Sequence, residues 1–237
     1  MVLQRISLTI DQPLLERMDA LVESAEYKNR SQAISALLRK TLKGRIVEKT
    51  LVLAGKNNFL LEKIVLWLKK NGMEDIVIAS GKTDAVERKI GDGKKFGVKI
   101  EYVHDENKGT ALALKNAQHL LKEPFLLCYS DVFCQDLVLK DLMAYHDLHK
   151  GACTLVLTSS PRPTKFGVAR LLGEKITGFE EKPSSAEGFL INAGVAVCNP
   201  QVFSFLSNEP SFEKNALPYI ARQGQLVGFV YYGKWLH

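Results

Sequence analysis

The chain has few cysteines and no closely spaced pair of them. Its four cysteines, at positions 128, 134, 153 and 198 of 237 residues, form no C-x-x-C motif. Such a motif would point to a zinc or redox site. Because Cys128 and Cys198 lie inside apolar runs, we expect buried, reduced thiols, which favours a cytoplasmic protein.

Long hydrophobic runs and a secretion signal are also absent. No apolar stretch approaches the length of a membrane span, and Met1 to Arg5 lead into alternating polar and apolar positions. We therefore expect no membrane partner. The net charge of +6 favours an anionic partner, while 46% hydrophobic and 24% charged residues are ordinary globular values.

The chain also lacks a glycine-rich loop after the apolar stretch Thr50–Gly55, which is typical of a buried strand. The pattern downstream is that of a nucleotide-binding α/β domain, where a glycine-rich loop should follow the first strand and hold phosphates with its backbone N–H groups. Here Gly55 is followed by Lys56, Asn57 and Asn58, and a helical pattern then starts at once. The phosphate loop is missing, and Lys56 is the nearby cation.

The first 44 residues predict one strand and two helices. Arg5–Ile10 alternates polar and apolar residues with period two, as in a half-buried strand. Asp11 and Ser31 are N-cap candidates, each followed by apolar residues at helical spacing, and Gly44 suits a helix end. So short a segment cannot bury its own apolar surface. We therefore predict a dimer in which two strands pair as an antiparallel ribbon.

This segment resembles the ribbon-helix-helix family of repressors over positions 4–43. The resemblance rests on the strand Arg5–Asp11, on Leu14–Asp19 and on the segment Tyr27–Ile34. It implies a homodimer or higher homo-oligomer that binds DNA. Base edges would be read by Arg5, Ser7 and Thr9, and a phosphate held by Asn29, Arg30 and Ser31. The alternative is a small dimerisation module whose polar face is solvated.

Beyond a linker at positions 45–49, residues 50–237 alternate between apolar strand-like runs and helical patterns. This alternation predicts a Rossmann-like, mostly parallel α/β sheet with helices on both faces. Ligands of such sheets bind beyond the carboxyl ends of the strands. Asp131 follows the apolar run Pro124–Tyr129 at that place, where a carboxylate can hold Mg²⁺ beside substrate phosphates.

The order of short motifs along this domain resembles the sugar-1-phosphate nucleotidyltransferases. The motifs are Asn71–Ile78, Gly91–Val98, Lys108–Ala111, Ser130-Asp131, Lys165–Val168, Gly178–Pro183 and Ile191–Val195. The resemblance implies that Gly109 and Thr110 lie against the nucleobase and that Asp131 binds Mg²⁺. It also implies a sugar site lined by Gly167, Glu181, Lys182, Asn192 and Gly194.

Departures from that family favour a different interpretation, and two of them concern the phosphate and metal sites. The glycine-rich loop, which should carry an Arg and precede a Pro-Lys segment, is missing. In addition, Trp235-Leu236 is followed by His237 where the family has a second metal-binding Asp, and an imidazole is a poor Mg²⁺ ligand.

From these patterns we predict a DNA-binding transcriptional regulator. Its degenerate large domain would be inactive, with no catalytic residue, and would sense a nucleotide-sugar or sugar phosphate. One alternative is a Mg²⁺-dependent sugar-1-phosphate nucleotidyltransferase with an atypical phosphate site. A second alternative is an assembly module that does not bind DNA.

Overall fold

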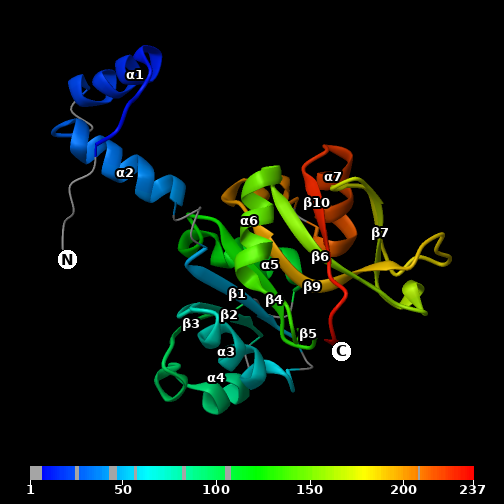
Figure 1. Cartoon of the computed structure of the whole chain (residues 1–237). Helices are drawn as coiled ribbons and strands as arrows, with labels where there is room; N and C mark the ends of the chain where they lie inside the picture. Colours follow the sequence, from blue (N-terminus) through cyan, green and yellow to red (C-terminus); the bar gives the residue numbers. More distant parts are fainter. Residues whose placement is uncertain are drawn as a thin grey trace. The chain divides into compact units, whose positions relative to one another are not determined.

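The computed structural model describes residues 7–24, 27–42, 47–55, 58–81, 84–104, 108–207 and 209–237. The chain divides into two compact units, Met1–Arg45 and Ile46–His237, whose elements are labelled in Figure 1. Within the described ranges, no helix has both the length and the apolar character that crossing a bilayer requires.

The small unit contains two helices, α1 (Gln12–Glu23) and α2 (Arg30–Leu42). Asp11 caps α1 by accepting a 2.9 Å hydrogen bond from the backbone N–H of Leu14. The Arg30 guanidinium joins the two helices through an ion pair with Asp19, with 2.5 Å between Nε and Oδ1. This hydrogen-bonded partner holds the pKa of Asp19 below its ordinary value.

The strand predicted for Arg5–Ile10 does not appear in the described part of this unit. Ser7–Ile10 has no regular structure, and Arg5 and Ile6 lie outside the described residues. A strand exists only with a ladder partner, and a single chain offers none here. The described core of the unit is small, since Met18 and Ala33 are the only described residues in it that are buried.

The large unit is built on a nine-stranded sheet with the order β3-β2-β1-β4-β9-β6-β10-β8-β7. A separate two-stranded ribbon pairs β11 with β5. The strands are β1 (Lys49–Ala54), β2 (Asp75–Ser80), β3 (Lys99–His104), β4 (Phe125–Tyr129), β5 (Phe133–Cys134), β6 (Cys153–Ser159), β7 (Gly167–Leu172), β8 (Lys175–Glu181), β9 (Leu190–Cys198), β10 (Leu226–Val230) and β11 (Trp235–Leu236).

The sheet is mixed, so the prediction of a mostly parallel sheet holds for only part of it. Strands β3, β2, β1 and β4 are parallel neighbours, as predicted. Beyond them, β9 runs antiparallel to both β4 and β6, and β7 and β8 form an antiparallel pair. The β7–β8 pair is antiparallel because its connection is short, with Gly173 at a φ of 59°. A parallel pair would need a crossover of a dozen or more residues.

Helices cover both faces of the sheet, as Figure 1 shows. They are α3 (Leu61–Lys70), α4 (Asp84–Ile90), α5 (Thr110–Ala117), α6 (Leu139–His149) and α7 (Leu217–Arg222), with short helical turns η1 (Lys94–Phe96), η2 (Gln118–Leu120), η3 (Pro163–Lys165), η4 (Pro200–Phe205) and the π-helical η5 (Phe212–Ala216).

Strand β1 shows how one central strand serves two cores. Leu51 and Leu53 pack into the core that contains the buried residues of α5 and α7. Val52 and Ala54 pack into the core of α3, α4 and α6. Successive side chains of a strand point to opposite faces, so a sheet covered on both sides requires apolar residues at successive positions, as at Leu51 to Ala54. All four cysteines are buried in these cores as free thiols.

We expect Leu51→Ala to destabilise the large unit by about 2–5 kcal/mol, because Leu51 is completely buried at the centre of the sheet. Urea unfolding of the whole chain would measure this loss. Leu66→Ala is the matched control, since the Leu66 side chain on α3 is 55% exposed and its loss should change stability by less than about 0.5 kcal/mol. Equal effects would contradict this assignment of the core.

Candidate functional site

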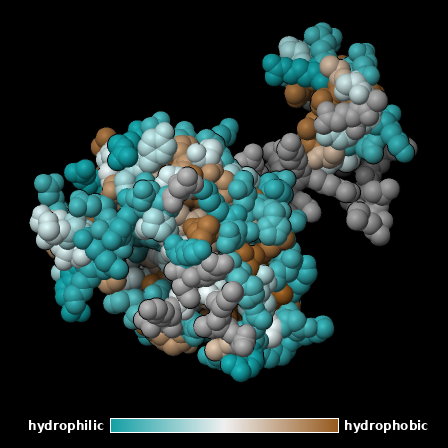
Figure 2. Space-filling model, turned by 180° about the vertical axis from the view of Figure 1, so that it is seen from behind, coloured by the Kyte–Doolittle hydropathy of each residue, from teal (hydrophilic) through white to brown (hydrophobic). Residues whose placement is uncertain are grey.

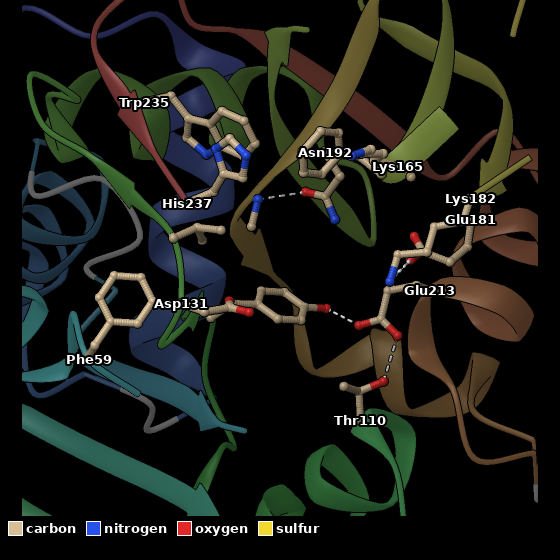
Figure 3. Close-up of a pocket in the computed structure, with 15 residues that line it drawn as sticks. Phe59, Thr110, Asp131, Lys165, Glu181, Lys182, Asn192, Glu213, Trp235 and His237 are labelled. Atoms are coloured by element: carbon tan, nitrogen blue, oxygen red, sulfur yellow. Dashed lines mark hydrogen bonds and ion pairs between the residues drawn. The ribbon is translucent and has the colours of Figure 1, made fainter. Parts of the chain in front are cut away.

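A pocket of about 460 Å³ opens at the carboxyl end of β4. Parallel strands gather ligand-binding side chains at this edge of a sheet. Figure 3 shows the pocket with Asp131, Thr110, Glu213 and Lys182 around it. Its lining consists of Phe59, Thr110, Tyr129, Asp131, Val132, Lys165, Phe166, Gly167, Glu181, Lys182, Asn192, Gly194, Glu213, Trp235 and His237.

Asp131 reaches the pocket because it lies two residues beyond the end of β4. Burial raises the pKa of its carboxyl group, while the nearby charges of Lys182 and His237 lower it without cancelling the effect of burial. The surroundings of Asp131 thus disfavour the ionised form of its carboxyl group. Such a group gains from a cation brought by a ligand.

Gly167 and Glu181 face each other across the β7–β8 pair. A Cβ atom at Gly167 would lie 2.8 Å from Oε2 of Glu181 and would collide with the Phe179 ring. Burial is also the main cause of the raised pKa of Glu181, followed by the charge of Glu213. The ammonium of Lys182 lies 3.6 Å from Oε1 of Glu181. The pair therefore offers an acceptor and a cation side by side.

Backbone geometry holds Lys182 and Gly194 in unusual conformations. Lys182 has a φ of 49°, and its backbone N–H donates a 3.0 Å hydrogen bond to the carbonyl of Phe166. Gly194 has a φ of 77°, its N–H donates to Oδ1 of Asn192 at 3.0 Å, and an added Cβ would collide with Val132. Positive φ at a non-glycine residue often marks a functional site.

Of the predicted ligand-binding residues, the structure brings together Thr110, Gly167, Glu181, Lys182, Asn192 and Gly194, with Asp131 beside them. Gly109 lies at the turn before α5 instead, with a φ of 114°, where a side chain would collide with the carbonyl of Pro210. Its lack of a side chain lets Pro210 approach, because the Pro210 carbonyl accepts a 2.9 Å hydrogen bond from the N–H of Ala111.

Tyr129 and Glu213 are among the lining residues that sequence reasoning missed. The Tyr129 hydroxyl donates to Oε1 of Glu213, and the Thr110 hydroxyl donates to Oε2 at 2.7 Å. These contacts join positions 84 and 103 residues apart, so no local spacing marks them. The one local signal is Ser211, which caps η5 and places Glu213 in its first turn.

An aromatic wall closes one side of the pocket. The rings of Trp235 and His237 are stacked with their centroids 4.4 Å apart, and the Phe166 ring meets Trp235 edge-on at 5.2 Å. The indole N–H of Trp235 donates a 3.1 Å hydrogen bond to the carbonyl of Ala193. Because Ala193 lies on β9, this hydrogen bond ties the wall to the sheet, while β11 pairs with β5 in the separate ribbon.

The donors present suit Mg²⁺ only in part. Among the described residues, no group of three or more His, Cys, Asp or Glu side chains could hold a metal ion. Mg²⁺ is often bound by one or two carboxylates together with substrate phosphates, and Asp131 can supply one carboxylate. Gly55 has open space beside it, and Lys56 and Asn57, which follow it in sequence, lie outside the described residues.

The residues predicted to bind DNA belong to the small unit, and those that the structure describes lie at its surface. Ser7, Thr9, Asn29 and Ser31 are exposed, but Ser7 and Thr9 do not lie on a strand. Arg30, predicted to contact a phosphate, holds Asp19 with both Nε and Nη2, at 2.5 and 2.6 Å. Arg5 lies outside the described residues.

Comparison with known proteins assigns a clear relationship to the large unit. A family profile described as nucleotidyl transferase matches residues 44–236. A mannose-1-phosphate guanyltransferase of Candida albicans is 36% identical over 200 residues, which are 79% of this chain and 54% of the relative. The enzyme of the same name from Saccharomyces cerevisiae is 35% identical over 200 residues, covering 80% and 55%. The chain spans about half the length of these curated relatives.

Solved structures share the fold at lower identity. HddC from Yersinia pseudotuberculosis has a TM-score of 0.66 at 16% identity, covering 79% of this chain and 92% of that one. The same protein complexed with GMP-PN has a TM-score of 0.67 at 17% identity, with 80% and 92% covered.

These matches overturn the prediction of a DNA-binding transcriptional regulator. Residues 44–236 match a nucleotidyl transferase profile, and relatives at about 35% identity are mannose-1-phosphate guanyltransferases. Nothing among the matches supports a ribbon-helix-helix module. The prediction was wrong because a polar strand face and an Asn-Arg-Ser turn can serve local purposes, as the Arg30–Asp19 pair does. The findings favour the enzyme alternative.

We expect Asp131→Asn to stabilise the folded chain at neutral pH. The pKa of Asp131 is raised by burial, so the folded state carries a penalty for the charged form above that pKa. The penalty disappears as the pH falls through the folded pKa toward the ordinary value of about 4. The stability gained by the variant should therefore shrink on acidification, as urea midpoints at several pH values would show.

The matched control is Asp136→Asn, five residues further on, because Asp136 is exposed. It should give no such pH-dependent gain. If Asp131→Asn left the midpoint unchanged at neutral pH, burial would not be straining this carboxylate.

Proposed function

The chain belongs to the nucleotidyl transferase family, and from that premise we propose that its large unit is a sugar-1-phosphate nucleotidyltransferase with an atypical phosphate site. The observation that carries the proposal is the pocket itself, in which Asp131, Thr110 and the Glu181–Lys182 pair meet at the carboxyl edge of the sheet. The names of the relatives make mannose 1-phosphate and GTP the first substrates to test.

In this reaction a phosphate oxygen of the sugar 1-phosphate attacks the α-phosphorus of the nucleoside triphosphate. A new P–O bond forms, the bond to the β-phosphate breaks, and pyrophosphate leaves with the bonding electron pair. Such a step needs little from protein groups beyond positioning and charge stabilisation. The pocket residues should therefore be judged by how they hold and orient the two substrates.

We assign the roles as follows. The ammonium of Lys182 attracts the sugar phosphate, and Glu181 beside it accepts hydrogen bonds from sugar hydroxyls. Thr110 and Gly109, at the start of α5, lie on the nucleobase side. Asp131 would hold Mg²⁺ together with substrate phosphates, and that ion would neutralise charge that develops on the phosphate oxygens.

The phosphate side of the site is atypical because only residues 56–60 separate Gly55 from the start of α3 at Leu61. A segment this short cannot supply a full loop of N–H donors around a triphosphate. Since phosphoryl-type transfer depends on such donors, we expect slow turnover, while binding on the sugar side should be less affected.

The test is incubation of the full chain with GTP, mannose 1-phosphate and Mg²⁺, followed by chromatography for GDP-mannose. We expect slow product formation that falls by about 100-fold or more in Asp131→Ala, as when one electrostatic stabiliser is lost. Asp136→Ala, at an exposed position, should keep wild-type turnover. No product from any pairing of nucleoside triphosphate with hexose 1-phosphate would refute the proposal.

For the small unit we propose self-association, which a specific observation favours. Leu8 and Leu14 are 54% and 53% exposed, and Leu37 and Leu38 on α2 are also exposed. Figure 2 shows apolar atoms at the surface of this unit. When a subunit interface is apolar, its residues are exposed in a single chain. The exposed leucines around this small core are therefore what an interface between two copies would look like. A second copy would bury them.

Sedimentation of the full chain should therefore give a mass of at least twice the monomer value of 26.5 kDa. Leu14→Asp combined with Leu38→Asp should shift the protein to monomer at micromolar concentration, because a charge buried in an apolar interface is strongly unfavourable. Arg17→Ala, at an exposed position on α1, is the control and should leave the mass unchanged. A monomeric wild type would exclude this interface.

A further inference from the structure

The carboxylate of Glu213 is fixed by hydroxyl groups from three parts of the chain. Oε1 accepts from the Tyr129 hydroxyl, and Oε2 accepts from Thr110 at 2.7 Å and from Ser211 at 2.8 Å. Figure 3 shows Glu213 between Lys182 and Thr110, with a dashed line that joins it to Thr110. Burial and the charge of Glu213 raise the pKa of Tyr129 well above its ordinary value, so Tyr129 stays protonated and remains a donor.

The three donors come from elements that meet only in the folded domain. Tyr129 ends β4, Thr110 begins α5, and Ser211 caps η5. The Thr110 hydroxyl also accepts a 2.9 Å hydrogen bond from the N–H of Phe212. Glu213 therefore has no freedom to turn away from the pocket that it lines.

Counting acceptor sites shows what remains for a ligand. A carboxylate has about four lone-pair sites, two on each oxygen. Among the hydrogen bonds of the described residues, two reach Oε2 and one reaches Oε1. One acceptor site on Oε1 is left, in a side chain that lines the same pocket as Glu181.

We propose that Glu213 is a specificity-determining residue, whose remaining acceptor site on Oε1 takes a hydrogen bond from one sugar hydroxyl of the bound ligand. The inference rests on the proposed function and deepens it. The hydroxyl belongs either to the hexose or to the ribose of the nucleotide. Glu213 is hydrogen-bonded to Thr110, which we assign to the nucleotide side, and it lines the same pocket as Glu181, which we assign to the hexose. A ligand with hydrogen or a carboxylate in that place is rejected, since the first leaves an acceptor unpaired and the second repels it.

The experiment measures by titration calorimetry how tightly variants of the full chain bind each parent ligand and its deoxy analogues. One arm uses mannose 1-phosphate and its 2-, 3-, 4- and 6-deoxy analogues, and the other uses GDP with its 2′- and 3′-deoxy analogues. For wild type we expect one analogue in one arm to bind about 10- to 100-fold more weakly than its parent, as for a lost hydrogen bond to a charged group. The arm that contains this analogue identifies the hexose or the ribose.

Glu213→Leu, whose side chain has no acceptor atom, should remove this discrimination, so that parent and deoxy ligand bind within about 2-fold of each other. Ser211→Ala is the control, because it removes a donor from Oε2 and leaves Oε1 as it is. It should keep the wild-type discrimination. A residue with only a structural role would instead weaken every ligand by one common factor.

The outcomes separate this inference from the proposed function. If wild type binds the parent ligands and Glu213→Leu keeps the discrimination, or if wild type shows none, Glu213 is not a specificity residue and the proposed function stands. If wild type binds neither mannose 1-phosphate nor GDP, the inference is refuted for these ligands, whereas the proposed function is refuted only when no pairing of nucleoside triphosphate with hexose 1-phosphate gives product.

Discussion

The removal of carboxylates from water at one edge of the sheet is the constraint on which the rest of the site depends. Asp131, Glu181 and Glu213 all line one pocket, and burial raises the pKa of the first two. Like charges held close in a poorly hydrated space destabilise each other. The chain offsets this cost with Lys182 beside Glu181 and with hydroxyl donors around Glu213. What remains of the cost is relieved when a ligand supplies cations or hydroxyl groups.

The fold around that edge exists to hold these side chains in place. Asp131 is positioned by the end of β4, Glu181 by the β7–β8 pair, and Asn192 by the start of β9. Each of these strands is hydrogen-bonded to at least one neighbouring strand. The backbone hydrogen bonds therefore resist small displacements of the pocket wall. Gly167 and Gly194 add the close approaches that a side chain would prevent.

Much of this could be predicted from sequence, because the signals were local. Apolar runs such as Thr50–Ala54 predict buried strands, and short motifs place Asp131, Glu181, Lys182 and Asn192 at one edge of the sheet. The antiparallel half of the sheet was missed because strand direction depends on connection length and partner choice, which apolar patterns do not encode. Glu213 and Tyr129 were missed because their contact spans 84 residues. The regulator interpretation failed because the missing phosphate loop and the His237 at the position of a metal-binding Asp do not undo the relationship that residues 44–236 show to the nucleotidyl transferases.

The hydrogen bonds around Glu213 also have a consequence for how the protein is made. They join residues 110, 129 and 213, so the pocket cannot close until most of the chain has left the ribosome. Strands β1 to β4 can pair earlier, since all four precede β9 in the chain, whereas β9 must insert between β4 and β6. Non-local pairings of this kind slow folding. During that interval the apolar edge of β4 is uncovered, and the nascent chain is then most exposed to aggregation and to the action of chaperones.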